Sequence, residues 1–263
     1  MDLDLAGKRI LVTGASRGIG LATTMAFLAE GASVVAVARR STPALEATGA
    51  QFVSADLSTP DGPAQMVESV LATDPRLDVL VNNVGGGDLP DGVLTDPFGG
   101  DDADWLSTIN LNLLAAVRVT RAAAPALVQA RGAVVNVSSD SALTPHTAPL
   151  PYTTAKAALN AFSRGLAERL APAGVRVNVV TPASTRTGMI EAEGGIVTAL
   201  AAAHGVEHAE FLAGFPQFAG LITGQLVEPD EVARIIVLLA SPTMPSAVGS
   251  NWALHAGTLK APA

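Results

Sequence analysis

Two side chains at the start of an apolar helical pattern could together move a proton. Tyr152 and Lys156 stand four residues apart at the beginning of a stretch that we expect to be helical from Tyr152 to Leu170. Residues at this spacing share one face of a helix, so the phenol and the ammonium group would lie side by side. A nearby cation favours the phenolate and lowers the pKa of a tyrosine, which allows proton exchange near neutral pH. The alternative is a surface helix that carries both residues by chance.

Composition narrows the classes of protein to which the chain can belong. Its 263 residues suit one large α/β domain or two small ones, and 49% of them are hydrophobic while only 4% are aromatic. We therefore expect closely packed helices on a sheet. The net charge of -8 argues against a nucleic-acid partner or an anionic membrane. The absence of cysteine excludes disulfides, thiolate metal sites and cysteine nucleophiles, and no metal site is predicted.

Targeting and membrane signals are not evident in the sequence. The stretch Met1–Arg9 carries two acidic residues and lacks the basic and apolar regions of a signal peptide. No apolar run approaches the roughly 20 residues of a membrane helix. A soluble, cytoplasmic protein is the expectation.

A glycine-rich turn near the N-terminus indicates a phosphate site. A short β-rich run, Arg9–Thr13, leads into Gly14-Ala-Ser-Arg-Gly-Ile-Gly20, and a helical pattern continues to about Glu30. Glycines let the backbone turn tightly against a ligand, and a helix N-terminus offers free N–H groups to a phosphate. The alternative, a purely structural turn between strand and helix, is not excluded by this motif alone.

The end of the second expected strand bears on the choice of cofactor. Residues 33–38 form an apolar run that ends in Ala38 and Arg39, where a dinucleotide fold that binds NAD often has an acid. Arginine suits the 2′-phosphate of NADP, and Arg17 in the glycine turn adds a second one. Both residues favour NADP, against the alternative of solvated surface arginines.

Strands and helices alternate along the rest of the chain, which predicts a parallel sheet with helices on both faces. We find no linker or repeat, so residues 1–263 are taken as a single domain. Further strands are expected at residues 51–55, 77–81, 133–137, 175–181 and 247–254, and helices at residues 60–73, 104–128 and 228–239.

Polar residues and loops follow the expected strand ends, where open α/β sheets bind ligands. Residues 183–226 are apolar and punctuated by glycine, and are interpreted as a lid over a substrate pocket or a helical excursion that packs on a partner. Two asparagines, Asn110 and Asn112, interrupt the helix expected at 104–128.

Taken together, these motifs resemble the short-chain dehydrogenase/reductase family in its form of roughly 250 residues. The resemblance covers nearly the whole chain and implies a Rossmann-type, doubly wound sheet of seven strands in the order 3-2-1-4-5-6-7. The motifs occur in this order: Thr13-Gly14-x3-Gly18-Ile19-Gly20, Asp56, Asn82-Asn83-Val84-Gly85, Asn110, Ser139, Tyr152-x3-Lys156, and Pro182 followed by Thr187.

The resemblance also implies roles for individual residues. Tyr152 exchanges the proton, Lys156 tunes it and holds the nicotinamide ribose, and Ser139, thirteen residues before Tyr152, stabilises the substrate oxygen, while Ser138 is structural. Asn110 is expected to hold a water that links Lys156 to solvent. The residues expected to bind the cofactor are Gly14, Ser16, Arg17, Gly18, Ile19, Gly20, Arg39, Asp56, Leu57, Asn83, Gly85, Tyr152, Lys156, Pro182 and Thr187.

The implied activity is NADP(H)-dependent interconversion of a ketone and a secondary alcohol. A largely apolar substrate is expected from the predicted pocket walls, which are Leu143, His146, Leu150, Met189 and part of residues 211–218, with Ser139 also binding the substrate. Three alternatives remain open: a non-catalytic NADP(H) sensor, an NAD-preferring alcohol dehydrogenase, and epimerisation or dehydration on the same scaffold.

Three departures from the family pattern stand out. Val84 replaces an alanine, Ala183 replaces a glycine near the nicotinamide, and His255-Ala256-Gly257 stands where Asp-Gly-Gly is usual. The last change affects a region often used in family tetramers. A homo-oligomer, dimer or tetramer, is nevertheless expected from the long helices.

Overall fold

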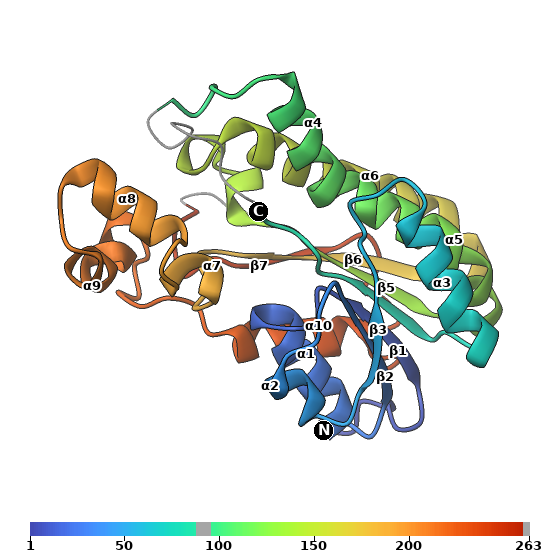
Figure 1. Cartoon of the computed structure of the whole chain (residues 1–263). Coiled ribbons are helices and arrows are strands. Elements are labelled where there is room, and N and C mark those ends of the chain that lie inside the picture. The colour runs from blue at the N-terminus through green and yellow to red at the C-terminus, as the bar shows by residue number, and fades with distance from the viewer. Residues whose placement is uncertain (88–95, 260–263) are drawn as a thin grey trace.

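Seven parallel strands form the centre of the protein (Figure 1). The computed structural model describes residues 1–87 and 96–259. The sheet order is β3-β2-β1-β4-β5-β6-β7, so the predicted doubly wound topology is confirmed. The strands are β1 Arg9–Thr13, β2 Ser33–Ala38, β3 Gln51–Ser54, β4 Val79–Asn82, β5 Ala133–Val137, β6 Arg176–Pro182 and β7 Asn251–Leu254.

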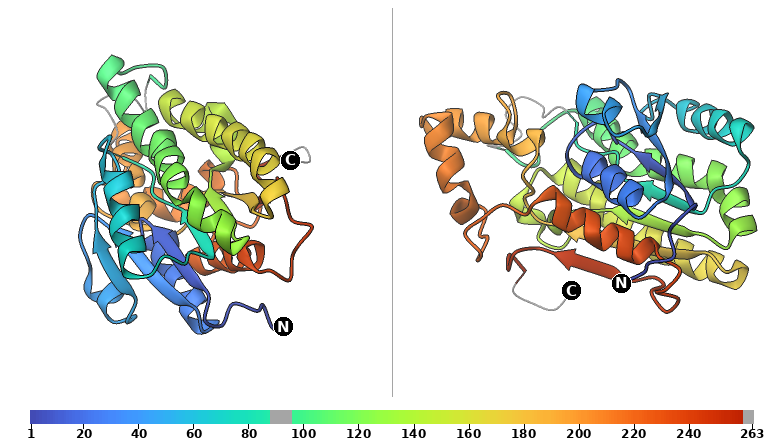
Figure 2. Two further views of the ribbon diagram at one scale, coloured as in Figure 1. Left: turned by 90° about the vertical axis from the view of Figure 1, so that its right-hand side faces the viewer. Right: turned by 90° about the horizontal axis from the view of Figure 1, so that it is seen from below.

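Helices cover both faces of the sheet, as two of the views show (Figure 2). On one face α1, Gly18–Ala29, packs against α10, Pro229–Ala240, over a core that includes Phe27 and Ile236. The other face carries α3, Gly62–Thr73, α5, Ala115–Ala130, and α6, Leu150–Leu170. Burial on both faces is the reason that the central strands are apolar throughout. The shorter elements are α2 Pro43–Glu46, α4 Asp102–Ile109, α7 Gly188–Glu191, α8 Ile196–His204 and α9 His208–Phe218, with the short 3₁₀ turns η2 Asp140–Ala142, η3 Pro145–Thr147 and η4 Ala171–Ala173.

The expected lid, residues 183–226, consists largely of helices. They form a lobe, at the left of Figure 1, in which α8 packs on α9. An aromatic cluster holds the lobe together, with His204 stacked on Phe211 at 5.4 Å and Phe218 5.2 Å from Phe211. Many apolar side chains of residues 183–226 therefore pack inside a small helical unit.

One continuous helical stretch runs from Asp102 to Ala130, and by length and composition it is apolar enough to cross a membrane. In the fold it packs against the sheet and against α3 and α6, and it buries Ala115, Val119 and Leu127. A π-helical turn, η1 Asn110–Leu114, lies within it, where a plain α-helix was expected. Such turns insert one extra residue and are often found at functional sites.

The last strand is shorter than predicted, because it begins at Asn251 and not at residue 247. The Asn178 side chain donates to the Ala247 carbonyl at 2.7 Å and accepts from the Ser250 N–H at 3.0 Å. These bonds hold residues 247–250 in a turn, and Gly249 adopts φ +66° within it.

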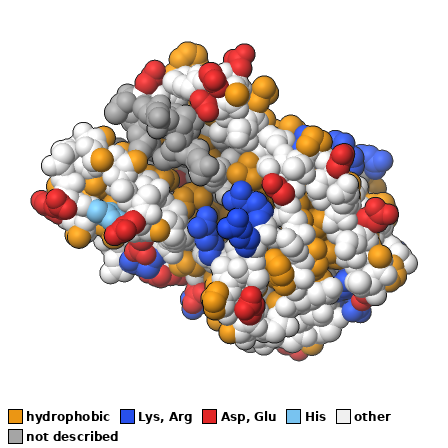
Figure 3. Space-filling view, in the orientation of Figure 1, with side chains coloured by type: hydrophobic (Ala, Val, Ile, Leu, Met, Phe, Trp, Pro, Cys, Tyr) orange, Lys and Arg blue, Asp and Glu red, His pale blue; other side chains and the backbone are white. Residues whose placement is uncertain are grey.

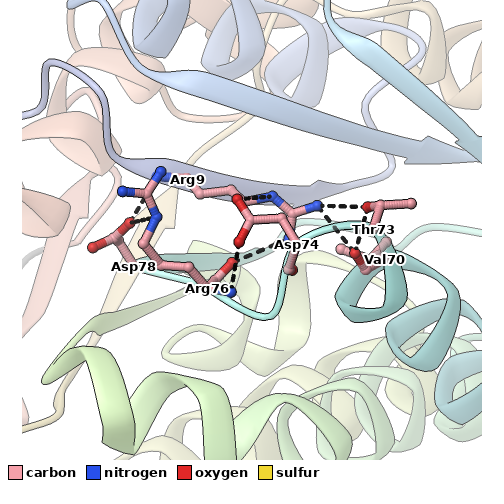
Figure 4. A network of polar contacts seen from close by, with 6 residues as sticks. All are labelled: Arg9, Val70, Thr73, Asp74, Arg76 and Asp78. Carbon is pink, nitrogen blue, oxygen red and sulfur yellow. Dashed lines mark hydrogen bonds and ion pairs between the residues drawn. The ribbon is translucent and has the colours of Figure 1, made fainter.

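The buried Arg9 guanidinium ties the first strand to the C-terminal end of α3 (Figure 4). It donates to the carbonyl oxygens of Val70, Asp74 and Arg76 at 3.0, 2.7 and 3.1 Å, and to the Thr73 hydroxyl at 3.2 Å. The last carbonyls of a helix have no partners within it, and a cation there also suits the helix dipole. Arg9 is thus a structural cap, remote from the carboxyl ends of the strands.

Candidate active site

The glycine-rich turn has the shape of a phosphate cradle. Gly14 and Gly18 adopt φ values of +66° and +55°, and a Cβ added to Gly20 would lie 2.2 Å from the Gly14 carbonyl oxygen. Helix α1 begins at Gly18, and no side chain caps its first N–H groups. A turn without side chains in front of free helix N–H groups fits a dinucleotide pyrophosphate.

Asn83 holds this turn in place. Its side-chain amide donates to the carbonyl oxygens of Thr13 and Gly14 at 3.0 and 3.2 Å, while its backbone N–H donates to the Thr13 hydroxyl at 3.0 Å. The side chain expected to contact the ribose is therefore engaged with the turn. Val84 donates its N–H to the same hydroxyl at 3.1 Å, and its side chain packs against the core on the face of the sheet that carries α3, α5 and α6. The larger side chain that replaces alanine is therefore accommodated in this core.

Two of the predicted NADP residues lie at the surface beside the turn. Arg17 and Arg39 are both exposed, and Lys and Arg side chains gather near the middle of the face shown in Figure 3. Asp56 is also exposed, and its pKa is lowered by hydrogen bonds from Ser58 and by the charge of Arg39. The side chain of Leu57 is buried, so only its backbone can face a ligand.

Ser139, Tyr152 and Lys156 come together at the carboxyl end of β5. The Lys156 Nζ donates to the Val137 carbonyl at 2.9 Å and lies 5.8 Å from the centre of the Tyr152 ring. Ser139 follows β5 directly, and its hydroxyl is within hydrogen-bonding reach of Tyr152. Ser138 is buried, with its hydroxyl 3.4 Å from the Lys156 carbonyl oxygen, as a structural residue would be.

The pKa of Tyr152 departs from its usual value in the direction opposite to the sequence expectation. Burial raises it to about 12, the nearby Asp140 adds to the rise, and the hydrogen bond with Ser139 opposes it. Burial likewise lowers the pKa of Lys156 to about 8. Removal from water disfavours the charged form of each group, and here this effect is larger than their mutual influence. In the protein without cofactor, burial thus favours the neutral phenol of Tyr152 and makes the Lys156 ammonium group more acidic.

The structure does not place Asn110 beside Lys156. Its amide donates to the Ser58 carbonyl, and its oxygen accepts from Arg118 at 2.6 Å. Asn112 lies at the site: a Cβ added to Gly85 would be 3.0 Å from its Oδ1 and 3.1 Å from the Lys156 Nζ. Residues two apart project to nearly opposite sides of a helix, so the sequence could not tell which asparagine faces inward.

Asn112 is fixed from both ends of its amide. Its Oδ1 accepts from the Gly86 N–H at 2.8 Å, and its Nδ2 donates to the Gly86 and Thr108 carbonyls at 2.8 and 3.0 Å. The π-helical turn carries this buried side chain to the end of β4. Gly85 contacts the Lys156 amine and the Asn112 oxygen, which leaves no room for a side chain there.

The expected walls of the substrate pocket lie around this centre. Met189 on α7 reaches over Gly86, since an added Cβ there would meet its Cε at 2.4 Å. Leu143 and Met189 are 40% and 41% exposed, and His146 is exposed on η3. Leu150 donates its N–H to the Pro97 carbonyl at 2.9 Å. Residues 88–95, between β4 and α4, lie outside the described residues.

The end of β6 closes the cofactor side of the cleft. Thr187 approaches the glycine turn, with its Cγ2 3.0 Å from a Cβ built on Gly18. Pro182 is the last residue of β6, and Ala183 extends the pairing by donating its N–H to the Leu254 carbonyl at 2.9 Å. The positive-φ residues other than glycine are Asp4, Arg131 and Ala256, so Ala183 replaces glycine without backbone strain.

The sequence expectation missed a group of polar residues next to Ser139. Asp140 accepts from the Ser139 hydroxyl at 3.5 Å and from the Thr258 hydroxyl at 3.0 Å, and the imidazole of His255 lies nearby. Burial raises the pKa of Asp140 from its usual value. Asp140 was visible in the sequence as an acid next to the expected catalytic serine. Its partners lie more than 110 positions further along the chain.

No group of three or more His, Cys, Asp or Glu side chains in residues 1–87 and 96–259 is arranged to hold a metal ion. A cavity of about 320 Å³ lies at the amino ends of the strands, lined in part by Lys8, Asp78 and Arg176. It contains none of the predicted site residues, so the candidate site is the cleft at the opposite end of the sheet.

Comparisons with known proteins agree with this fold. The family described as short chain dehydrogenase matches residues 8–194. The uncharacterized oxidoreductase YvrD of Bacillus subtilis is 31% identical over 99% of each chain. L-xylulose reductase of Mus musculus is 37% identical over 72% of this chain and 76% of that protein.

Among solved structures, L-sorbose reductase from Gluconobacter frateurii, determined in complex with NADPH and L-sorbose, superposes with a TM-score of 0.86. It is 31% identical, and the match covers 100% of both chains. The chain therefore belongs to the short-chain dehydrogenase family of oxidoreductases.

Proposed function

We propose that this protein is an NADP(H)-dependent oxidoreductase that interconverts a ketone and a secondary alcohol. The observation that carries the proposal is the meeting of Ser139, Tyr152 and Lys156 at the carboxyl end of β5, beside the glycine turn. A sensor would need the turn but not these three side chains. Epimerisation and dehydration have no separate feature in their favour.

The cofactor, when bound, supplies or accepts the hydride at the carbonyl carbon. In reduction, Tyr152 gives its proton to the substrate oxygen, and Ser139 donates a hydrogen bond to that oxygen as charge develops on it. Lys156 holds the ribose and returns a proton to Tyr152. Asn112 takes the place that the sequence had given to Asn110, because it lies against Gly85 and the Lys156 amine.

The preference for NADP(H) rests on two exposed arginines next to the turn, Arg17 and Arg39. Guanidinium groups bind a 2′-phosphate through paired hydrogen bonds, and Asp56, an acid whose charge interacts with Arg39, accepts hydrogen bonds from Ser58. The NADPH complex of L-sorbose reductase supports this choice. We expect Arg39→Ala to raise the KM for NADPH at least about tenfold and to leave that for NADH unchanged. Equal effects on both cofactors would favour an NAD-preferring enzyme.

The decisive experiment follows consumption of NADPH with a panel of aliphatic, cyclic and aryl ketones. Tyr152→Phe is expected to stop turnover and to retain NADPH binding, measured by quenching of tryptophan fluorescence. Glu168→Gln, on the exposed side of the same helix, serves as the control and should keep full activity. Full activity in Tyr152→Phe would refute the assignment. Tight NADPH binding without turnover of any ketone would instead favour a sensor.

The pocket walls support a substrate with an apolar part. We propose Leu143, Leu150 and Met189 as apolar walls, with the exposed His146 as one polar group at the rim. The lobe at residues 183–226 is proposed as the lid. We further propose a cytoplasmic homo-oligomer, a dimer or tetramer, without nucleic-acid or membrane partners. Sedimentation velocity would test the assembly, and a monomer at micromolar concentration would contradict it.

A further inference from the structure

Asp140 is a charged group at the centre of the site that the proposed reaction does not use. Its carboxylate lies next to both hydroxyls that would hold the substrate oxygen: Oδ1 is 3.5 Å from the Ser139 Oγ, and its charge acts on Tyr152. The Ser139 hydroxyl is also fixed by Ser141, whose Oγ and N lie 2.9 and 3.3 Å away. The carboxylate therefore lies beside the hydroxyl that would hold the substrate oxygen.

The C-terminal stretch holds the carboxylate in place. The Thr258 hydroxyl donates to Oδ2 at 3.0 Å, and the imidazole of His255 lies near Asp140. His255 is fixed in turn, because its Nδ1 accepts from the Gly257 N–H at 3.1 Å. The Ala256 carbonyl accepts from the Ile222 N–H at 2.8 Å, which joins the same stretch to the lobe. The C-terminal stretch thus contacts Asp140 on one side and the lobe on the other.

Asp140 retains capacity for a ligand. A carboxylate accepts up to about four hydrogen bonds, and Asp140 is only half-buried. Its negative charge raises the pKa of Tyr152 and so disfavours the phenolate that remains after proton donation. A donor group on the substrate would satisfy the free lone pairs and offset this charge.

We infer that Asp140 is a specificity-determining residue that selects substrates with a hydroxyl group next to the carbonyl. The inference rests on the proposed function and names its substrate class: α-hydroxyketones and the vicinal diols formed from them. The two oxygens of such a ketone are separated by roughly one hydrogen-bond length. The carbonyl oxygen can therefore accept from Ser139 while the hydroxyl donates to Oδ1. The largely apolar substrate expected from the sequence would need such a hydroxyl to use the remaining acceptor capacity of this carboxylate.

A hydroxyl fits better than an ammonium group. The site already contains the Lys156 amine, which lies against the Tyr152 ring, and the imidazole of His255 near Asp140. A further cation would be repelled by Lys156 and would have to lose its hydration shell. A neutral donor gains a charge-assisted hydrogen bond without either cost.

The test compares 1-hydroxy-2-butanone with 2-butanone, which differ by one hydroxyl group, at saturating NADPH. The wild-type protein is expected to reduce the hydroxyketone with a kcat/KM at least about tenfold higher, the range of one hydrogen bond to a charged group. Asp140→Ala should remove this preference by lowering kcat/KM for the hydroxyketone, mostly through KM, so that the ratio of the two kcat/KM values falls toward one. Thr258→Val, which keeps the charge but releases the carboxylate, should lose part of the preference.

Controls separate this inference from folding and from the proposed function. Asp140→Asn preserves the shape of the side chain, and an unchanged thermal midpoint and NADPH affinity would show that the variants are folded. Equal reduction of the two ketones by the wild-type protein, a parallel loss on both in Asp140→Ala, or a preference for 1-amino-2-butanone would overturn the inference alone. Failure to reduce any ketone would overturn the proposed function and the inference with it.

Discussion

Replacement of Lys156 by methionine should stabilise the protein while it abolishes turnover. The Lys156 residue is 3% exposed, and its ammonium group has one hydrogen-bond partner among the described residues, the Val137 carbonyl at 2.9 Å. A buried cation with so few partners is costly to transfer from water. Methionine has a similar volume and needs no hydrogen bond.

The magnitude follows from the pKa of Lys156, which burial lowers from 10.5 to about 8. At about 1.4 kcal/mol for each pH unit, this interval corresponds to roughly 3 kcal/mol of destabilisation when the group is charged. The variant also loses the hydrogen bond to Val137 and the contact with the Tyr152 ring, which together lower its stability by about 1–2 kcal/mol. A net gain of about 1–2 kcal/mol is therefore expected for Lys156→Met near neutral pH.

The dependence on pH distinguishes this explanation from better packing. Below about pH 8 the lysine is charged in the folded and unfolded chains, and its full cost is present. Between about pH 8 and 10.5 the folded protein has released the proton and the unfolded chain has not, so wild-type stability rises with pH relative to the variant. Tyr152 stays neutral in the folded state over this range, because its pKa is about 12.

Urea unfolding of both proteins at about pH 7 and about pH 10 measures this difference. The advantage of the variant should shrink or disappear at the higher pH. The reasoning would be refuted by a variant that is less stable than wild type at pH 7, or by a gain that stays constant across this range. NADPH-dependent turnover, followed in the same samples, should be absent in the variant at both values.

Two further predictions concern stability alone. Arg9→Met should destabilise the protein by about 3 kcal/mol in urea unfolding, because four acceptors at the end of α3 lose a buried donor; a loss below about 1 kcal/mol would contradict the role of Arg9 as a cap. Ala256→Gly should raise the free energy of unfolding by about 0.5–1 kcal/mol, because Ala256 adopts φ +45°. An unchanged or lower thermal midpoint in that variant would show that the surrounding contacts favour the methyl group.

Local residue order was sufficient to predict most of the fold. The apolar runs at residues 9–13, 33–38 and 133–137 are strands because residues buried on both faces of a sheet must be apolar throughout. Gly14-x3-Gly18-x-Gly20 identified the turn because positive φ values and close contacts admit only glycine there. Patterns of this kind depend only on residues that are close together in the sequence.

The sequence was less reliable where distant parts of the chain meet. It could not distinguish Asn110 from Asn112, because the choice depends on a π-helical turn packed against Gly86. It gave the wrong direction for the pKa of Tyr152, because burial by surrounding elements outweighs the charge of a neighbour on the same helix.

The spacing of Tyr152 and Lys156, the glycine turn and the position of Ser139 were all readable from the sequence alone, because each is set by a few adjacent residues. Only the tertiary structure brought Thr258 and His255 to Asp140, from the far end of the chain. Hydrogen bonds and desolvation depend on distances in space, and residues more than 110 positions apart leave no local pattern that predicts such a contact. The proton-transfer residues were therefore evident before the fold was known, and the carboxylate proposed to select the substrate was not.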